Sequence, residues 1–110
     1  MGREPIYHQV CKASELTEGS RKGVVVKGRK IILVNVGGKI HAVENYCTHE
    51  GKPLADGKIE DGTVTCIHHS VKYDLATGKV VDDRGYVGVE PIRVYEARVE
   101  GDDVLIKVYW

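Results

Sequence analysis

The stretches CTHEG (residues 47–51) and CIHHS (residues 66–70) each place a cysteine two or three positions before a histidine. A lone cysteine or histidine is commonly a structural residue, but thiols and imidazoles gathered in so short a segment indicate a metal site. In the second stretch His68 repeats the spacing of Cys47 and His49, whereas His69 lies one position further on. Spacing alone therefore leaves both His68 and His69 open as ligands.

The rest of the chain has the composition of a small all-β domain. Val and Ile greatly outnumber Leu, and glycine-containing turns such as VGGK (36–39) and ATGK (76–79) recur at hairpin spacing. We predict a single domain over residues 1–110, built of stacked antiparallel sheets as a sandwich or barrel. The expected strands are 6–12, 22–27, 30–36, 39–43, 58–61, 63–66, 72–75, 79–81, 92–99 and 103–109. Residues 13–19 are expected to hold the one helical turn, with Ser14 as its N-cap.

Both Cys/His stretches fall in predicted loops, each directly after a strand. The hairpin KIEDGTVT (58–65) separates them and would bring the two loops side by side. Two loops at the ends of neighbouring strands form a two-sided site. We therefore expect the metal-binding part to cover about residues 44–82.

Three metal chemistries use thiols and imidazoles together. Structural zinc accepts two of each, although zinc fingers usually pair Cys with Cys and His with His. A blue-copper site needs an axial Met, and Met1 is the single methionine. A [2Fe-2S] cluster with two Cys on one iron and two His on the other suits loops that each supply one of each. The mixed cluster is favoured, with a zinc-stabilised interaction domain as the alternative.

The pattern CTH (47–49) followed by CIHH (66–69) resembles the signature of the Rieske [2Fe-2S] family. The resemblance extends to GGKIHAVENYCTHEGKPLADG (37–57), to YDLATGKV (73–80) and to the closing stretch EPIRVYEARVEGDDVLIKV (90–108). It implies that Cys47, His49, Cys66 and His69 bind the cluster and that His68 is a neighbour. It also implies that the loop DDRGYVGVEP (82–91) shields the cluster, with Pro53, Leu54 and Val71 as apolar cover.

The sequence departs from the family pattern at two positions after the second histidine. Ser70 stands where the family usually has Gly, and Ser tolerates positive φ poorly, so we expect a slightly different backbone there. Val71 replaces a Ser that donates to the cluster sulfurs in high-potential relatives, whereas Tyr73 keeps the matching Tyr. Mixed clusters span about −150 to +300 mV, and we expect a low-to-intermediate potential with Tyr73 as the remaining tuning residue.

These observations predict an electron-transfer protein rather than an enzyme. With 16 basic and 16 acidic residues the net charge is zero, which argues against general binding to nucleic acid or to a membrane surface. Neither a signal peptide nor a long apolar span is visible, so we expect a soluble, cytoplasmic monomer. The resemblance implies a one-electron carrier between a reductase and a terminal oxygenase or similar enzyme. The alternative is a small subunit of a larger oxidoreductase.

Cys11, His8 and His41 lie in predicted strands away from the two Cys/His stretches. An odd number of cysteines without an export signal argues against a disulfide framework. All three side chains are therefore expected to be structural.

Overall fold

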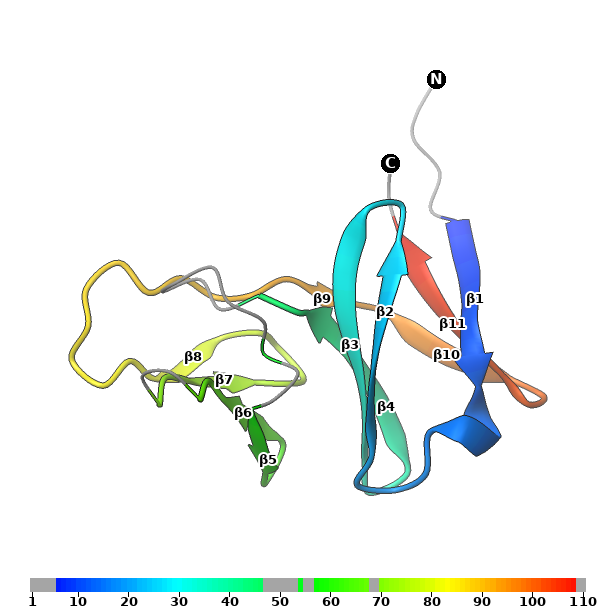
Figure 1. The fold of residues 1–110 in the computed structure, drawn as a ribbon, viewed down its shortest axis with the longest axis horizontal. Helices are drawn as coiled ribbons and strands as arrows, with labels where there is room; N and C mark the ends of the chain where they lie inside the picture. Colours follow the sequence, from blue (N-terminus) through cyan, green and yellow to red (C-terminus); the bar gives the residue numbers. More distant parts are fainter. Residues whose placement is uncertain (1–5, 47–53, 55–56, 68–69, 109–110) are drawn as a thin grey trace.

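The computed structural model describes residues 6–46, 54, 57–67 and 70–108 (Figure 1). Short strands dominate, because β-branched residues alternate with polar ones between tight turns. The elements in chain order are β1 (Ile6–Lys12), η1 (Ala13–Glu15), β2 (Arg21–Val26), β3 (Arg29–Val36), β4 (Lys39–Glu44), β5 (Lys58–Glu60), β6 (Thr63–Thr65), β7 (Lys72–Asp74), β8 (Val80–Asp82), β9 (Val94–Tyr95), β10 (Ala97–Glu100) and β11 (Asp103–Val108).

The strands form three antiparallel sheets, which confirms the predicted all-β class. One sheet has the order β1-β11-β10, the second β2-β3-β4-β9 and the third β5-β6-β7-β8. The first two sheets form the base of the molecule, and the third projects to one side (Figure 1). We call this third sheet, which contains the segment between the two Cys/His stretches, the distal sheet.

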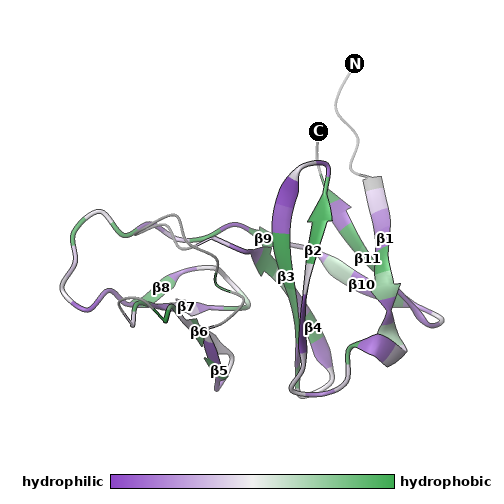
Figure 2. Ribbon diagram, in the orientation of Figure 1, coloured by the Kyte–Doolittle hydropathy of each residue, from purple (hydrophilic) through white to green (hydrophobic). Residues whose placement is uncertain are grey.

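Strand β3 is buried on both faces and joins two hydrophobic cores. Ile31 and Leu33 belong to a core shared with β1 and β11, whereas Ile32 and Val34 belong to a core shared with the distal sheet. All four side chains have 0% exposure. Figure 2 shows β3 hydrophilic at its first residues and hydrophobic through its middle. An uninterrupted apolar run is what a strand covered on both faces requires.

Two expectations about local structure were wrong. The predicted strand 92–99 is two strands: Val94–Tyr95 pairs with β4, and Ala97–Glu100 pairs with β11 in the other base sheet. The chain changes sheets at Glu96. The carbonyl of Glu96 accepts a hydrogen bond from the Lys107 amide at 2.9 Å, a normal distance for a strand pair. Ser14 does not cap a helix, because it lies within the 3₁₀ turn Ala13–Glu15 and its hydroxyl bonds the carboxylate of Asp102 at 3.2 Å.

Candidate metal centre

The second Cys/His stretch lies at the tip of the β6–β7 hairpin. The Cys66 amide donates to the carbonyl of Val71 at 2.8 Å, and the Ser70 amide donates to the carbonyl of Cys66 at 2.9 Å. Ser70 adopts φ 59°, the left-handed conformation that closes such a turn. The serine thus takes up the conformation that glycine would adopt freely. These two hydrogen bonds hold the backbone of Cys66 next to Ser70 and Val71, where the turn ends.

Cys66 lies where the chain passes from the core to the surface. Its side chain is 1% exposed, whereas that of the next residue, Ile67, is 55% exposed. Leu54, Val71 and Tyr73 belong to the same buried core as Cys66, and each has 0% exposure. Leu54 and Val71 are thus positioned to give the expected apolar cover, which stays a prediction, and the Cys66 thiol lies in surroundings from which water is excluded.

The first Cys/His stretch is flanked by a side chain that ties its two ends together. The backbone amide of Asn45 donates a hydrogen bond to the carbonyl of Lys30 in β3 at 2.9 Å. The Asn45 side-chain oxygen Oδ1 accepts a hydrogen bond from the Leu54 amide at 2.7 Å. Residues just before and just after 47–53 are thus held to each other and to β3. Sequence analysis did not identify Asn45, because nothing in residue spacing shows what an amide side chain will bond.

A second contact joins the distal sheet to the base. The Arg21 guanidinium, on β2, donates through Nη1 to the carbonyl of Gly57. The Gly57 amide in turn donates to the Leu54 carbonyl at 2.8 Å. A Cβ at Gly57 would lie 2.2 Å from the carbonyl oxygen of Thr65, so the chain passes β6 at a distance that only glycine allows.

Three of the four expected ligands, Cys47, His49 and His69, lie outside the described residues, as do His68 and Pro53. Among the residues that the structure describes, no group of three or more His, Cys, Asp or Glu side chains gathers as a metal site. The assignment of Cys47, His49, Cys66 and His69 therefore remains a prediction, supported at Cys66 by its fixed and buried position.

The loop expected to shield the cluster, residues 82–91, is partly packed and partly exposed. Val89 packs against the core that contains Cys66, and Ile92, just beyond the loop, is 3% exposed in that core. Tyr86 and Val87 are exposed at the loop's tip. One end of this loop thus contributes to the same apolar surroundings as Leu54 and Val71.

Cys11 and His41 occupy structural positions in the base. Cys11 is buried in the core between the two base sheets. This burial, and to a smaller extent the charge of Glu15, raises the pKa of the Cys11 thiol, whereas the charge of Lys22 lowers it. A thiol with a raised pKa forms little of the reactive thiolate. Partial burial, with a smaller contribution from Lys39, lowers the pKa of His41, and Asp74 opposes this.

Comparison with known proteins identifies the family. The family model of the Rieske [2Fe-2S] domain matches residues 6–96. The ferredoxin component of biphenyl 2,3-dioxygenase from Rhodococcus jostii (strain RHA1) is 31% identical over 98 residues, 89% of this chain and 89% of that protein. The ferredoxin component of the naphthalene 1,2-dioxygenase system from Pseudomonas aeruginosa is 33% identical over 92 residues, 84% and 86% of the two chains. This chain belongs to the Rieske [2Fe-2S] domain family.

A solved structure supports the same conclusion. A chain in the complex of reduced oxygenase and oxidized ferredoxin of carbazole 1,9a-dioxygenase superposes with a TM-score of 0.82 at 25% identity, over 92% of each chain. Family membership implies a [2Fe-2S] cluster bound by Cys and His. The residues fit this group, because the two stretches supply both ligand types and the thiol of Cys66 is held in an apolar core at the edge of the surface.

Proposed function

We propose that this chain is a one-electron carrier, taking electrons from a reductase and passing them to a terminal oxygenase or a similar redox enzyme. The match to relatives that are themselves ferredoxin components, over 89% of both chains in one case, carries this proposal. The oxygenase as acceptor is supported by the solved ferredoxin and oxygenase complex of the carbazole system. The protein acts as a carrier and not as a catalyst.

In this proposal Cys47 and Cys66 would hold one iron of the cluster through their thiolates, and His49 and His69 would hold the other through a ring nitrogen. The bound cluster supplies the one-electron chemistry. Leu54 and Val71 exclude water from the thiolate side, since both are fully buried beside Cys66. The second ring nitrogens of His49 and His69 would hold the protons that accompany the electron.

The proposal includes the organisation and location of the protein. We place the cluster-binding part at about residues 44–82 of a single domain, and we infer that the carrier is a cytoplasmic monomer. No helix in the described part of the chain is long and apolar enough to cross a membrane. Gel filtration of the purified protein tests the monomer, and cell fractionation tests the location.

Spectroscopy and ligand variants test the site. The dithionite-reduced protein should show a rhombic EPR signal, and a colourless protein that contains zinc would overturn the proposal. Cys66→Ala and His69→Ala should lose the signal. Cys11→Ala and His68→Ala are the matched controls and should keep it, because neither residue belongs to the proposed ligand set. Loss of the signal in His68→Ala with retention in His69→Ala would reverse the histidine assignment.

Tyr73 is proposed to raise the potential through its hydroxyl. Its ring is fully buried in the core that contains Cys66. A donated hydrogen bond contributes about 1–1.5 kcal/mol, which corresponds to about 40–65 mV for one electron. Tyr73→Phe should lower the midpoint potential by that amount in a redox titration. An unchanged potential would mean that Tyr73 is only a packing residue.

A further inference from the structure

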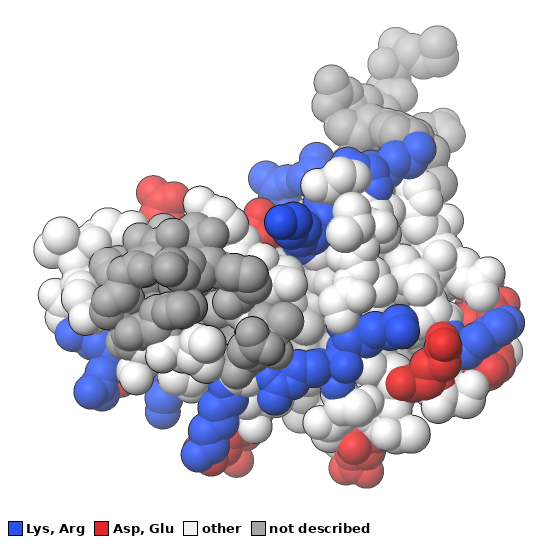
Figure 3. All heavy atoms as spheres, viewed as in Figure 1, with Lys and Arg blue, Asp and Glu red and all other residues white. Residues whose placement is uncertain are grey.

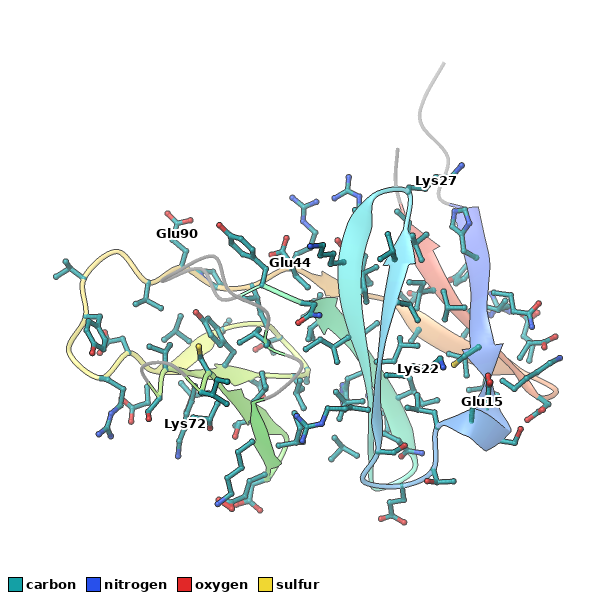
Figure 4. All side chains as sticks on the ribbon, viewed as in Figure 1. Glu15, Lys22, Lys27, Glu44, Lys72 and Glu90 are labelled. Carbon is teal, nitrogen blue, oxygen red and sulfur yellow. The ribbon has the colours of Figure 1, made fainter. Side chains whose placement is uncertain are left out.

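Several Lys and Arg side chains gather at one end of the base, where β2 turns into β3 and where β11 ends, although the net charge of the chain is zero. The opposite end, around η1 and the β10–β11 turn, carries both signs, because Lys12 pairs with Asp103 and Lys22 lies near Glu15. Figure 4 places Lys27 at the first end and Glu15 with Lys22 at the second, and Figure 3 shows Lys and Arg along the end from which both termini emerge. The cationic end is therefore a distinct surface.

The cationic end contains a cleft made of two hollows that share Arg29. One hollow, of about 280 Å³, lies against β9 and the other, of about 310 Å³, lies against the end of β4. We call the two together the basic cleft. Its charged lining residues are Arg29, Lys30, Arg93 and Lys107, with Glu44 and Glu96 as the acidic ones.

Three of these cations have no side-chain partner in the part of the chain that the structure describes. Among the described residues, the side chains of Arg29, Lys30 and Arg93 make no hydrogen bond or ion pair. Elsewhere on the surface, by contrast, Lys12 pairs with Asp103 at 2.7 Å and Lys58 pairs with Glu60 at 3.0 Å. The basic cleft thus holds positive charge that no carboxylate of the described chain neutralises.

The basic cleft lies directly beside the start of the first Cys/His stretch. Glu44, Asn45 and Tyr46 line its second hollow, and Tyr46 is followed by Cys47. The two walls are held together, because the Glu44 amide donates to the Arg93 carbonyl at 2.8 Å. Tyr46 is 46% exposed and adds an aromatic surface of the kind enriched in protein interfaces. A partner seated here would contact the residues that lead directly into the first Cys/His stretch.

We propose that the basic cleft binds an acidic segment of the protein redox partner. This inference rests on the proposed function, because it names the surface through which the carrier recognises its partner. Glu44 and Glu96 within the lining favour a partner with carboxylates at defined positions over a continuous polyanion.

An octaglutamate peptide, acetylated and amidated at its ends, is the probe for this surface. Titration into the ¹⁵N-labelled, cluster-loaded protein should shift the amide resonances of residues 28–30 and 93–96, with an affinity that falls as salt is raised. Arg29→Gln combined with Arg93→Gln should weaken binding about tenfold. Lys39→Gln combined with Lys79→Gln removes two exposed cations outside the basic cleft and is the matched control, which should bind like the wild type.

Three outcomes would overturn the inference: equal weakening in both double variants, shifts centred outside the basic cleft, or equally tight binding of duplex DNA or phosphatidylserine vesicles through Arg29 and Arg93. EPR spectra and midpoint potentials of both double variants should match the wild type. A wild-type protein without a cluster signal would refute the proposed function, whereas a normal signal without peptide binding refutes the basic cleft alone.

Discussion

Asn45 shows how one amide side chain can position a ligand loop without being a ligand. Its Oδ1 accepts the Leu54 amide at 2.7 Å, and Leu54 is buried in the core that contains Cys66. We expect Asn45→Ala to speed iron release to a chelator about fivefold to tenfold, because one hydrogen bond contributes about 1–1.5 kcal/mol. Release is followed as the loss of visible absorbance.

Two variants separate positioning of the loop from general stability. Asn45→Asp keeps the acceptor oxygen and should release iron at nearly the wild-type rate, although its charge should lower the midpoint potential. Asn35→Ala removes comparable bonds in the base, where the Asn35 side chain donates to Leu16 at 2.8 Å and accepts from Gly38 at 2.9 Å. Faster release in Asn35→Ala as well would mean that Asn45 acts only through overall stability.

His41 gives the folded protein a dependence on pH. Partial burial lowers the pKa of His41 below its usual value of 6.5, so the folded state binds fewer protons than the unfolded chain as the pH falls through this range. The stability that depends on neutral His41 is therefore present above about pH 6.5 and decreases below it. Denaturant unfolding at pH 7.5 and pH 5.5 should show a larger loss for the wild type than for His41→Gln. An equal loss of unfolding free energy in the wild type and in His41→Gln would contradict this role of His41.

At the scale of elements, the close approach of Gly57 to β6 sets the position of the distal sheet. A methyl group at Gly57 would lie 2.2 Å from the Thr65 carbonyl oxygen, and backbone atoms cannot move aside cheaply. Gly57→Ala should therefore lower the free energy of unfolding by about 1–3 kcal/mol. Gly23→Ala in β2 is the matched control, because nothing lies within 4 Å of its added Cβ. It should be neutral or stabilising by up to about 1 kcal/mol in chemical denaturation, and an equal loss in both variants would contradict a steric cause.

The strands themselves could be predicted from local pattern, but their partners could not. Apolar and polar residues alternate both before and after Glu96, so the sequence predicted one strand where the chain leaves one sheet for another. Ser14 has the chemistry of an N-cap, yet its hydroxyl donates a hydrogen bond to Asp102, which is far away in sequence. A pattern with period two reports which face is buried and carries no information about which strand is adjacent.

The candidate site divides in the same way. The Cys/His spacing and the family pattern predicted the ligand types and the loops that would carry them, because metal chemistry restricts both. The supports at Asn45 and Arg21 could not be predicted, since each contact joins a side chain to a backbone group across the fold. Ser70 shows the limit of residue preference: it adopts φ 59° because the bond from its amide to Cys66 fixes the turn.

At the scale of the whole molecule, β3 couples the base to the distal sheet through the two faces of one strand. Ile31 faces the core of the base sheets and Ile32 faces the core that contains Cys66, and both are fully buried. Ile31→Val and Ile32→Val should each lower the free energy of unfolding by about 0.5–1.5 kcal/mol. Local opening of the distal sheet requires only the core of Ile32 to separate. We therefore expect iron release to a chelator to be about fivefold faster in Ile32→Val than in Ile31→Val, for a difference of about 1 kcal/mol. Equal release rates at equal loss of stability would mean that the cluster is lost only when the whole molecule unfolds.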